Sequence, residues 1–306
     1  MLTKKRRLGE AIACYHQAIA LDPKLAQAHG ALGQALLRQG RFTEARDATR
    51  RALDLLPERA PLRGRVTQQL QACERLLALD EKLPAVLKGD AQPAGTQERL
   101  QLADLCVRYK KRYVAAVGFF TAAFAAEPML ATDLQRQHRY NAACCAALAA
   151  AGKGEDAATL DDQERARLRQ QARTWLAADL ALWAQQADSD DPNTRALVRK
   201  TLAHWQADTD LAGIREPEAL KQLPADEQQA CRQLWADVAA LPRPGGAARV
   251  AARMAHWQKD DDFAGVRDPA LARLPAEERA AWQRLWADVA ALLKKAETPA
   301  TQEGKK

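Results

Sequence analysis

Residues 26–59 read AQAHGALGQALLRQGRFTEARDATRRALDLLPER, and this stretch of 34 residues decides the fold. Small and apolar residues recur in it three or four positions apart, the spacing that places side chains on one face of a helix. Gly40 fits the turn after a first helix, and Pro57 fits the end of a second. The stretch therefore predicts a pair of helices whose small residues let them pack closely.

The same spacing of side chains occurs three times along the chain. An Ala is followed after four residues by an aromatic residue or Thr, after three more by Ala, and after five more by Pro. The copies are Ala11, Tyr15, Ala18 and Pro23; Ala45, Thr49, Ala52 and Pro57; and Ala116, Phe120, Ala123 and Pro128. The first two copies lie 34 residues apart, and a period of this length is typical of repeat proteins.

On this spacing and period, the chain resembles the tetratricopeptide repeat (TPR) family. The resemblance implies an all-α fold, a TPR-like α-solenoid of helical hairpins over residues 1–187. It gives near-complete units at 26–59 and 97–130, a truncated unit at 1–25 and a degenerate unit at 137–187. Each such hairpin leaves a face unburied until its neighbour stacks on it.

The segment between the second and third copies departs from the pattern. Apolar positions predict a helix from residue 60 to about Leu79, followed by a short LPAVL segment. Residues 90–95 are polar and contain Pro93, so they predict a loop.

The composition agrees with an all-α protein. Hydrophobic residues make up 47% of the chain and aromatic residues 5%, and helix-favouring Ala, Leu, Gln, Arg and Glu are abundant. No run reaches the roughly 18 to 20 consecutive apolar residues of a membrane span, so we expect no membrane association. The net charge is +9 over residues 1–150 and −2 over residues 151–306. We expect no nucleic-acid partner, because no aromatic residues interleave with the basic clusters in a binding pattern.

The second half of the chain carries a different duplication, rich in Trp. HWQADTDLAGIREP at 204–217 recurs as HWQKDDDFAGVRDP at 256–269, and LPADEQQACRQLWADVAAL at 223–241 recurs as LPAEERAAWQRLWADVAAL at 274–292. Each copy predicts a helix ending at its HWQ, a loop, a short turn and an amphipathic helix that starts at a Pro. We therefore expect two helical modules, at 188–242 and 243–295, and a disordered tail at 296–306.

No motif in the chain predicts catalysis, a cofactor or a metal. DTDLAG and DDDFAG resemble a calcium loop, but neither has the third acidic residue or the terminal Glu, so we expect Asp side chains that cap backbone amides. The six Cys residues show no paired spacing for zinc or disulfides, and they fit a reducing compartment. The sequence therefore predicts a non-catalytic, cytoplasmic protein with no cofactor.

What remains is a binding surface. In TPR domains the first helix of each hairpin lines a concave groove for a peptide or a partner helix, and the resemblance implies the same here. The corresponding positions are Gln27, Gln34, Arg38, Gln101, Arg108, His138 and Asn141. Each of them can also be an ordinary polar residue of a helix surface. We expect a protein or peptide partner and an interaction scaffold.

A longer resemblance covers most of residues 70–293. CERLLALDEKLPAVLKGD at 73–90, RYNAACCAALAAAG at 139–152 and the AGVRDP and LWADV motifs resemble the TPR-bearing C-terminal region of large bacterial serine/threonine protein kinases. The chain contains no Gly-rich loop, HRD or DFG motif, so the resemblance implies an alternative function. The chain would be the regulatory region of a kinase whose catalytic domain lies elsewhere.

The first helix poses a separate question. Met1 falls near the middle of what would be the first helix of a hairpin, so the helix of residues 10–20 would lack a covering partner. An uncovered solenoid end is normally capped. We expect either a fragment of a longer chain or a homodimer formed through this helix.

Overall fold

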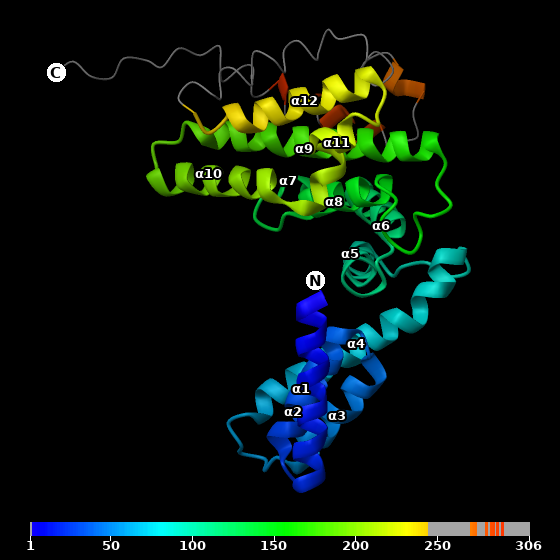
Figure 1. The fold of residues 1–306 in the computed structure, drawn as a ribbon, viewed down its shortest axis with the longest axis vertical. Coiled ribbons are helices and arrows are strands. Elements are labelled where there is room, and N and C mark those ends of the chain that lie inside the picture. The colour runs from blue at the N-terminus through cyan, green and yellow to red at the C-terminus, as the bar shows by residue number, and fades with distance from the viewer. Residues whose placement is uncertain are drawn as a thin grey trace, which may run out of the picture. The chain divides into compact units, whose positions relative to one another are not determined.

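The computed structural model describes residues 2–243, 270–273 and several positions between 279 and 290, and these residues form helices, turns and loops without a strand (Figure 1). The predicted all-α class is confirmed. The chain divides into two compact units, Met1–Pro93 and Ala94–Lys306, and each unit is described by itself. The domain limits expected from the sequence remain predictions.

The first unit contains four helices, which are α1 (Leu2–Leu21), α2 (Ala26–Gln39), α3 (Phe42–Leu55) and α4 (Arg63–Lys88). The α2–α3 hairpin is the predicted unit of residues 26–59. Gly40 ends α2 with φ 79°, a left-handed conformation that glycine adopts without steric cost. A Cβ at Gly33 would lie 3.0 Å from the Ala45 carbonyl oxygen and 2.2 Å from Thr49 Oγ1, so glycine here permits the close approach of the two helices.

Helix α1 packs on this hairpin with its larger apolar side chains. Ile12 is buried in one cluster with Leu32 and Leu36, and partly buried Leu8, Tyr15 and Ile19 surround them. This inward packing satisfies the main apolar face of α1. The homodimer predicted to form through α1 stays a prediction.

Helix α4 corrects one prediction. It runs unbroken for 26 residues through Pro84 to Lys88, where Gly89 ends it with φ 83°, whereas the sequence predicts a helix to about Leu79 and a separate segment. The predicted loop at 90–95 is confirmed. Pro84 removes one backbone donor, but Leu79 and Leu83, in the turn before it, are buried. We attribute the continuity of the helix to this packing.

The second unit begins with two helical hairpins. The first comprises α5 (Thr96–Leu105), the π-helical turn η1 (Cys106–Lys110), α6 (Tyr113–Ala126) and the short α7 (Met129–Thr132). The second comprises α8 (His138–Ala150) and α9 (Asp162–Ala187), joined by a long loop. The ring of Phe124 on α6 meets that of Trp175 on α9 edge to face at 6.0 Å, within the core that the two hairpins share.

The first copy of the Trp-rich module follows in the predicted order. Its elements are α10 (Pro192–Ala207), the 3-10 turn η2 (Thr209–Ile214), α11 (Pro217–Leu220) and α12 (Ala225–Ala240). Asp226 and Glu227 stand in the first turn of α12, where carboxylates interact favourably with the helix dipole. Most of the second copy lies outside the described residues, apart from η4 (Ala270–Arg273) and scattered positions after it, and so does the tail at 296–306.

Candidate functional site

Three of the seven predicted groove residues form one exposed row on α2. Gln27, Gln34 and Arg38 are seven and four residues apart, which places them within a narrow sector of the helix. Leu32, Ala35 and Leu36 are buried on the side of α2 that packs against its neighbours. At 1.5 Å per residue the row extends about 16 Å along the helix axis. It presents two amides and one guanidinium, and we call it the α2 row.

The remaining four residues belong to the second unit and are less uniform. Gln101 on α5 is half-buried, and Arg108 in η1 forms an ion pair with Asp104, 2.5 Å between Nε and Oδ1. His138 begins α8 and is half-buried; burial, with Arg136 nearby, lowers the pKa of its imidazole. Asn141 is exposed one turn further along α8. These residues belong to the other unit, so we describe them apart from the α2 row.

Helix α8 is covered by the chain's own Trp-rich module. The Tyr140 hydroxyl donates to Asp208 Oδ2 over 2.7 Å, and the Tyr140 ring stacks on Trp205 with 5.2 Å between ring centroids. Burial raises the pKa of Tyr140 far above its usual range, and the adjacent Asp208 carboxylate adds to the shift. A Cβ on Gly213 would lie 3.1 Å from the Cβ of Ala151, so η2 rests directly on the end of α8. Asn141 is the one residue of α8 in the exposed class.

The calcium-like DTDLAG segment is a structural loop in the first copy, as the sequence predicts. Asp208 Oδ1 accepts the backbone N–H of Asp210 over 2.9 Å, while Oδ2 accepts the Tyr140 hydroxyl. Within the described part of the chain, no group of three or more His, Cys, Asp or Glu residues could hold a metal ion. One oxygen of Asp208 thus caps η2, and the other joins η2 to α8.

Arg215 has a structural role that the sequence analysis missed. Its Nη1 donates to the carbonyl oxygens of Trp205 and Asp208, over 2.9 and 2.6 Å, at the end of α10. Its guanidinium also lies over the ring of Trp235, 5.5 Å from the centroid, which is a cation–π arrangement. The recurrence of this Arg in the second copy, as Arg267, was the available signal.

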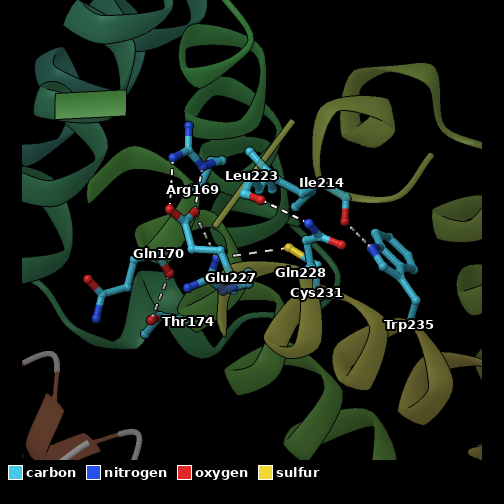
Figure 2. Close-up of polar contacts among 10 residues, drawn as sticks. Arg169, Gln170, Thr174, Ile214, Leu223, Glu227, Gln228, Cys231 and Trp235 are labelled. Atoms are coloured by element: carbon cyan, nitrogen blue, oxygen red, sulfur yellow. Dashed lines mark hydrogen bonds and ion pairs between the residues drawn. The ribbon is translucent and has the colours of Figure 1, made fainter. Parts of the chain in front are cut away.

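Two ion pairs connect helices of the second unit. Figure 2 shows Arg169 on α9 facing Glu227 on α12, with Nε and Nη2 donating to the two carboxylate oxygens over 2.6 and 2.9 Å. These hydrogen bonds lower the pKa of Glu227. Arg139 and Asp179 form a second buried pair at 2.6 Å between α8 and α9. These charges lie within helix interfaces, and we assign them to stability.

Comparisons with known proteins support the repeat assignment at the N-terminus. A TPR repeat model matches residues 1–40, and a tetratricopeptide repeat model matches residues 26–59. No curated protein matches the chain. Among the described residues no helix is long and apolar enough to cross a membrane. Residues 1–59, which include the α2 row, therefore carry TPR repeats, and repeats of this kind generally mediate protein–protein interactions.

Proposed function

We propose that the protein is a non-catalytic scaffold that binds a peptide or a partner helix along the α2 row. The observation that carries the proposal is the exposed line of Gln27, Gln34 and Arg38 on the helix that both TPR models cover. A primary amide both donates and accepts hydrogen bonds, so two amides suit the alternating groups of a peptide backbone. The guanidinium of Arg38 suits a carboxylate.

The charge of the first unit favours an acidic partner. Residues 1–93 contain 16 Lys and Arg against 10 Asp and Glu. An excess of positive charge accelerates encounters with acidic surfaces and adds to their affinity at low ionic strength. The second unit offers a further contact surface for the same partner, formed by Gln101, Arg108, His138 and Asn141.

Peptide selection on the whole chain tests the α2 row. A phage-displayed random peptide library is enriched on the wild type, and the affinities of the recovered peptides are measured for the Gln34→Ala/Arg38→Glu double variant. We expect at least a tenfold loss, since two hydrogen bonds of about 0.5–1.5 kcal/mol each are removed and a charge is reversed.

Arg51→Glu is the matched control, because Arg51 is exposed on α3 of the same unit and its reversal makes the same change in net charge. Circular dichroism verifies that both variants fold. If the recovered peptides bind the double variant as tightly as Arg51→Glu, the α2 row is not the binding surface.

The second candidate is a regulatory or interaction region of a bacterial serine/threonine protein kinase. The stretches at 73–90 and 139–152 support it through their resemblance to such regions. The in-frame coding DNA upstream of the Met1 codon tests it. An open frame that encodes a Gly-rich loop and an HRD motif would support the kinase region, and a stop codon directly upstream would refute it.

A cytoplasmic location goes with either candidate. All six cysteines are free thiols, and burial raises the pKa of Cys106 and Cys145 to about 12. Thiols in this state are poor nucleophiles and act as small apolar residues, which suits a reducing compartment.

A further inference from the structure

The first Trp-rich module contains a small surface pocket that neither repeat model covers. Its volume is about 290 Å³, and it is lined by Arg215, Pro217, Leu220, Lys221, Arg232 and Trp235, from the end of η2, α11 and α12. Pockets for small molecules and cofactors span roughly 300–1,000 Å³. A pocket at the lower limit of that range has room for one or two side chains of a partner.

The floor of the pocket is fixed in position. The Trp235 indole donates its Nε1–H to the Ile214 carbonyl oxygen over 2.7 Å, as Figure 2 shows, and Arg215 covers one side of the ring. Trp235 is nevertheless only half-buried. Its ring, with Pro217 and Leu220, therefore provides a rigid apolar contact surface, and such surfaces are typical of the energetic centres of protein interfaces.

The rim of the pocket is cationic. Arg232 is exposed, and its hydrogen bond goes to the neutral Gln228 amide oxygen over 2.6 Å, with no carboxylate in salt-bridge range within the described part of the chain. Lys221 pairs with Glu218 at 2.6 Å, but their side chains are 61% and 84% exposed. An ion pair so open to solvent is weak and can be exchanged for another carboxylate. Arg232 is thus a cation that an incoming acidic group can neutralise.

Comparison with the second copy shows that the residues of the pocket floor recur there, whereas the arginine of the rim does not. Arg215 and Trp235 recur there as Arg267 and Trp286, while the residue corresponding to Arg232 is Gln283. The recurring pair is explained by the hydrogen bonds that hold the first module together. The arginine at the rim is not required by that scaffold.

We propose that this pocket binds an apolar side chain of a protein partner, flanked by an acidic side chain that pairs with Arg232. The pocket walls accept the apolar group, and the exposed guanidinium of Arg232 selects the carboxylate by charge complementarity. A nucleic acid is disfavoured, because its backbone requires a longer row of cations than one pocket rim supplies. The site is separate from the α2 row and does not depend on the function proposed for that row.

The seven Trp indole N–H groups of the ¹⁵N-Trp-labelled full chain provide the assay. The Trp235 signal is assigned with Trp235→Phe or by triple-resonance spectra. The probe is the acetylated and amidated tetrapeptide Glu-Leu-Glu-Leu, and the control peptide is Gln-Leu-Gln-Leu. We expect the Glu peptide to shift the Trp235 signal saturably, and the Gln peptide to bind several-fold more weakly.

Two variants locate the effect. Arg232→Gln introduces the residue of the second copy and should weaken binding of the Glu peptide about three- to fivefold, the upper part of the range for an exposed ion pair. Arg199→Gln removes an exposed charge from α10 of the same unit and should leave binding unchanged.

Three results would overturn the proposal: no shift of the Trp235 signal up to the solubility limit of the Glu peptide, equal binding of both peptides, or equal loss in the two variants. None of them bears on the α2 row, whose variants lie in the other unit.

Discussion

The contact between Arg169 and Glu227 should determine much of the stability of the second unit. We predict that Glu227→Gln destabilises this unit by about 2 kcal/mol. The carboxylate accepts two hydrogen bonds from Arg169 and lies 3.5 Å from Arg173, and the side chains of Arg169 and Glu227 are 12% and 11% exposed. Hydrogen bonds to charged groups contribute about 1.5–3 kcal/mol, and loss of one partner leaves the other charge poorly solvated. Glutamine retains one acceptor, so the lower part of that range applies.

Tryptophan fluorescence is a selective assay for this change. All seven Trp residues lie at or beyond Trp175, so urea unfolding followed by their emission reports on the second unit. The same emission can be followed on heating, where a loss of 2 kcal/mol in a unit of this size lowers Tm by about 4–8 °C. Glu218→Gln is the control, because its carboxylate is 84% exposed and contributes little. Equal midpoints for the two variants would refute the assignment of Glu227 to stability.

The effect of Glu227 should also depend on pH. The hydrogen bonds from Arg169 lower the pKa of Glu227 from its ordinary value of 4.5. A carboxyl whose pKa is depressed by folding stabilises the native state above its unfolded pKa and loses that contribution as the pH falls through the folded pKa. The gap between wild type and Glu227→Gln should therefore narrow below about pH 4.5. A gap that stays constant to lower pH would contradict this reasoning.

Three further predictions concern other contacts. Gly33→Ala should destabilise the first unit by about 1–3 kcal/mol, because the added methyl group overpacks against α3. The circular dichroism transition should then come earlier, while the midpoint detected by Trp fluorescence stays unchanged. Equal stability of the variant and the wild type would contradict the close approach of the two helices. Tyr140→Phe should cost about 1–2 kcal/mol in Trp-detected urea unfolding, because Asp208 loses a donor; a null effect would argue against that bond. Light scattering on the whole chain should show a dimer if a second copy covers α1, and a monomer at every concentration would exclude it.

The local elements of this fold are largely predictable from the sequence. The hairpin of residues 26–59 follows from the spacing of small residues and from Gly40, since both act within one or two helical turns. The helix end predicted near Leu79 is wrong, because α4 continues through Pro84 to Lys88. The buried positions of Leu79 and Leu83 supply tertiary contacts that no local pattern reveals.

The contacts between elements are harder to predict. Arg169 and Glu227 are 58 residues apart in sequence, and Tyr140 and Asp208 are 68 apart. Charged and hydroxylated side chains in amphipathic helices are usually exposed, so nothing marks these as partners before the helices are placed. A partial signal existed in the duplication, since residues that recur in both copies, such as Asp208 and Asp260, are candidates for a shared structural role.

The two surfaces that the TPR resemblance implies, on α2 and on α8, differ in how much of them the chain itself leaves exposed. On α8 the module occupies the face formed by Tyr140, Cys144 and the end of the helix, and a partner would meet only Asn141 and the half-buried residues beside it. On α2 the whole α2 row stays exposed, and its polar groups need no rearrangement before binding. A surface that is already exposed avoids the cost of displacing packed elements, and only its own Gln and Arg side chains must be ordered on binding. If the predicted TPR groove is used, the α2 row should therefore carry the larger share of the binding energy, and the Asn141→Ala change should weaken recovered peptides less than Gln34→Ala.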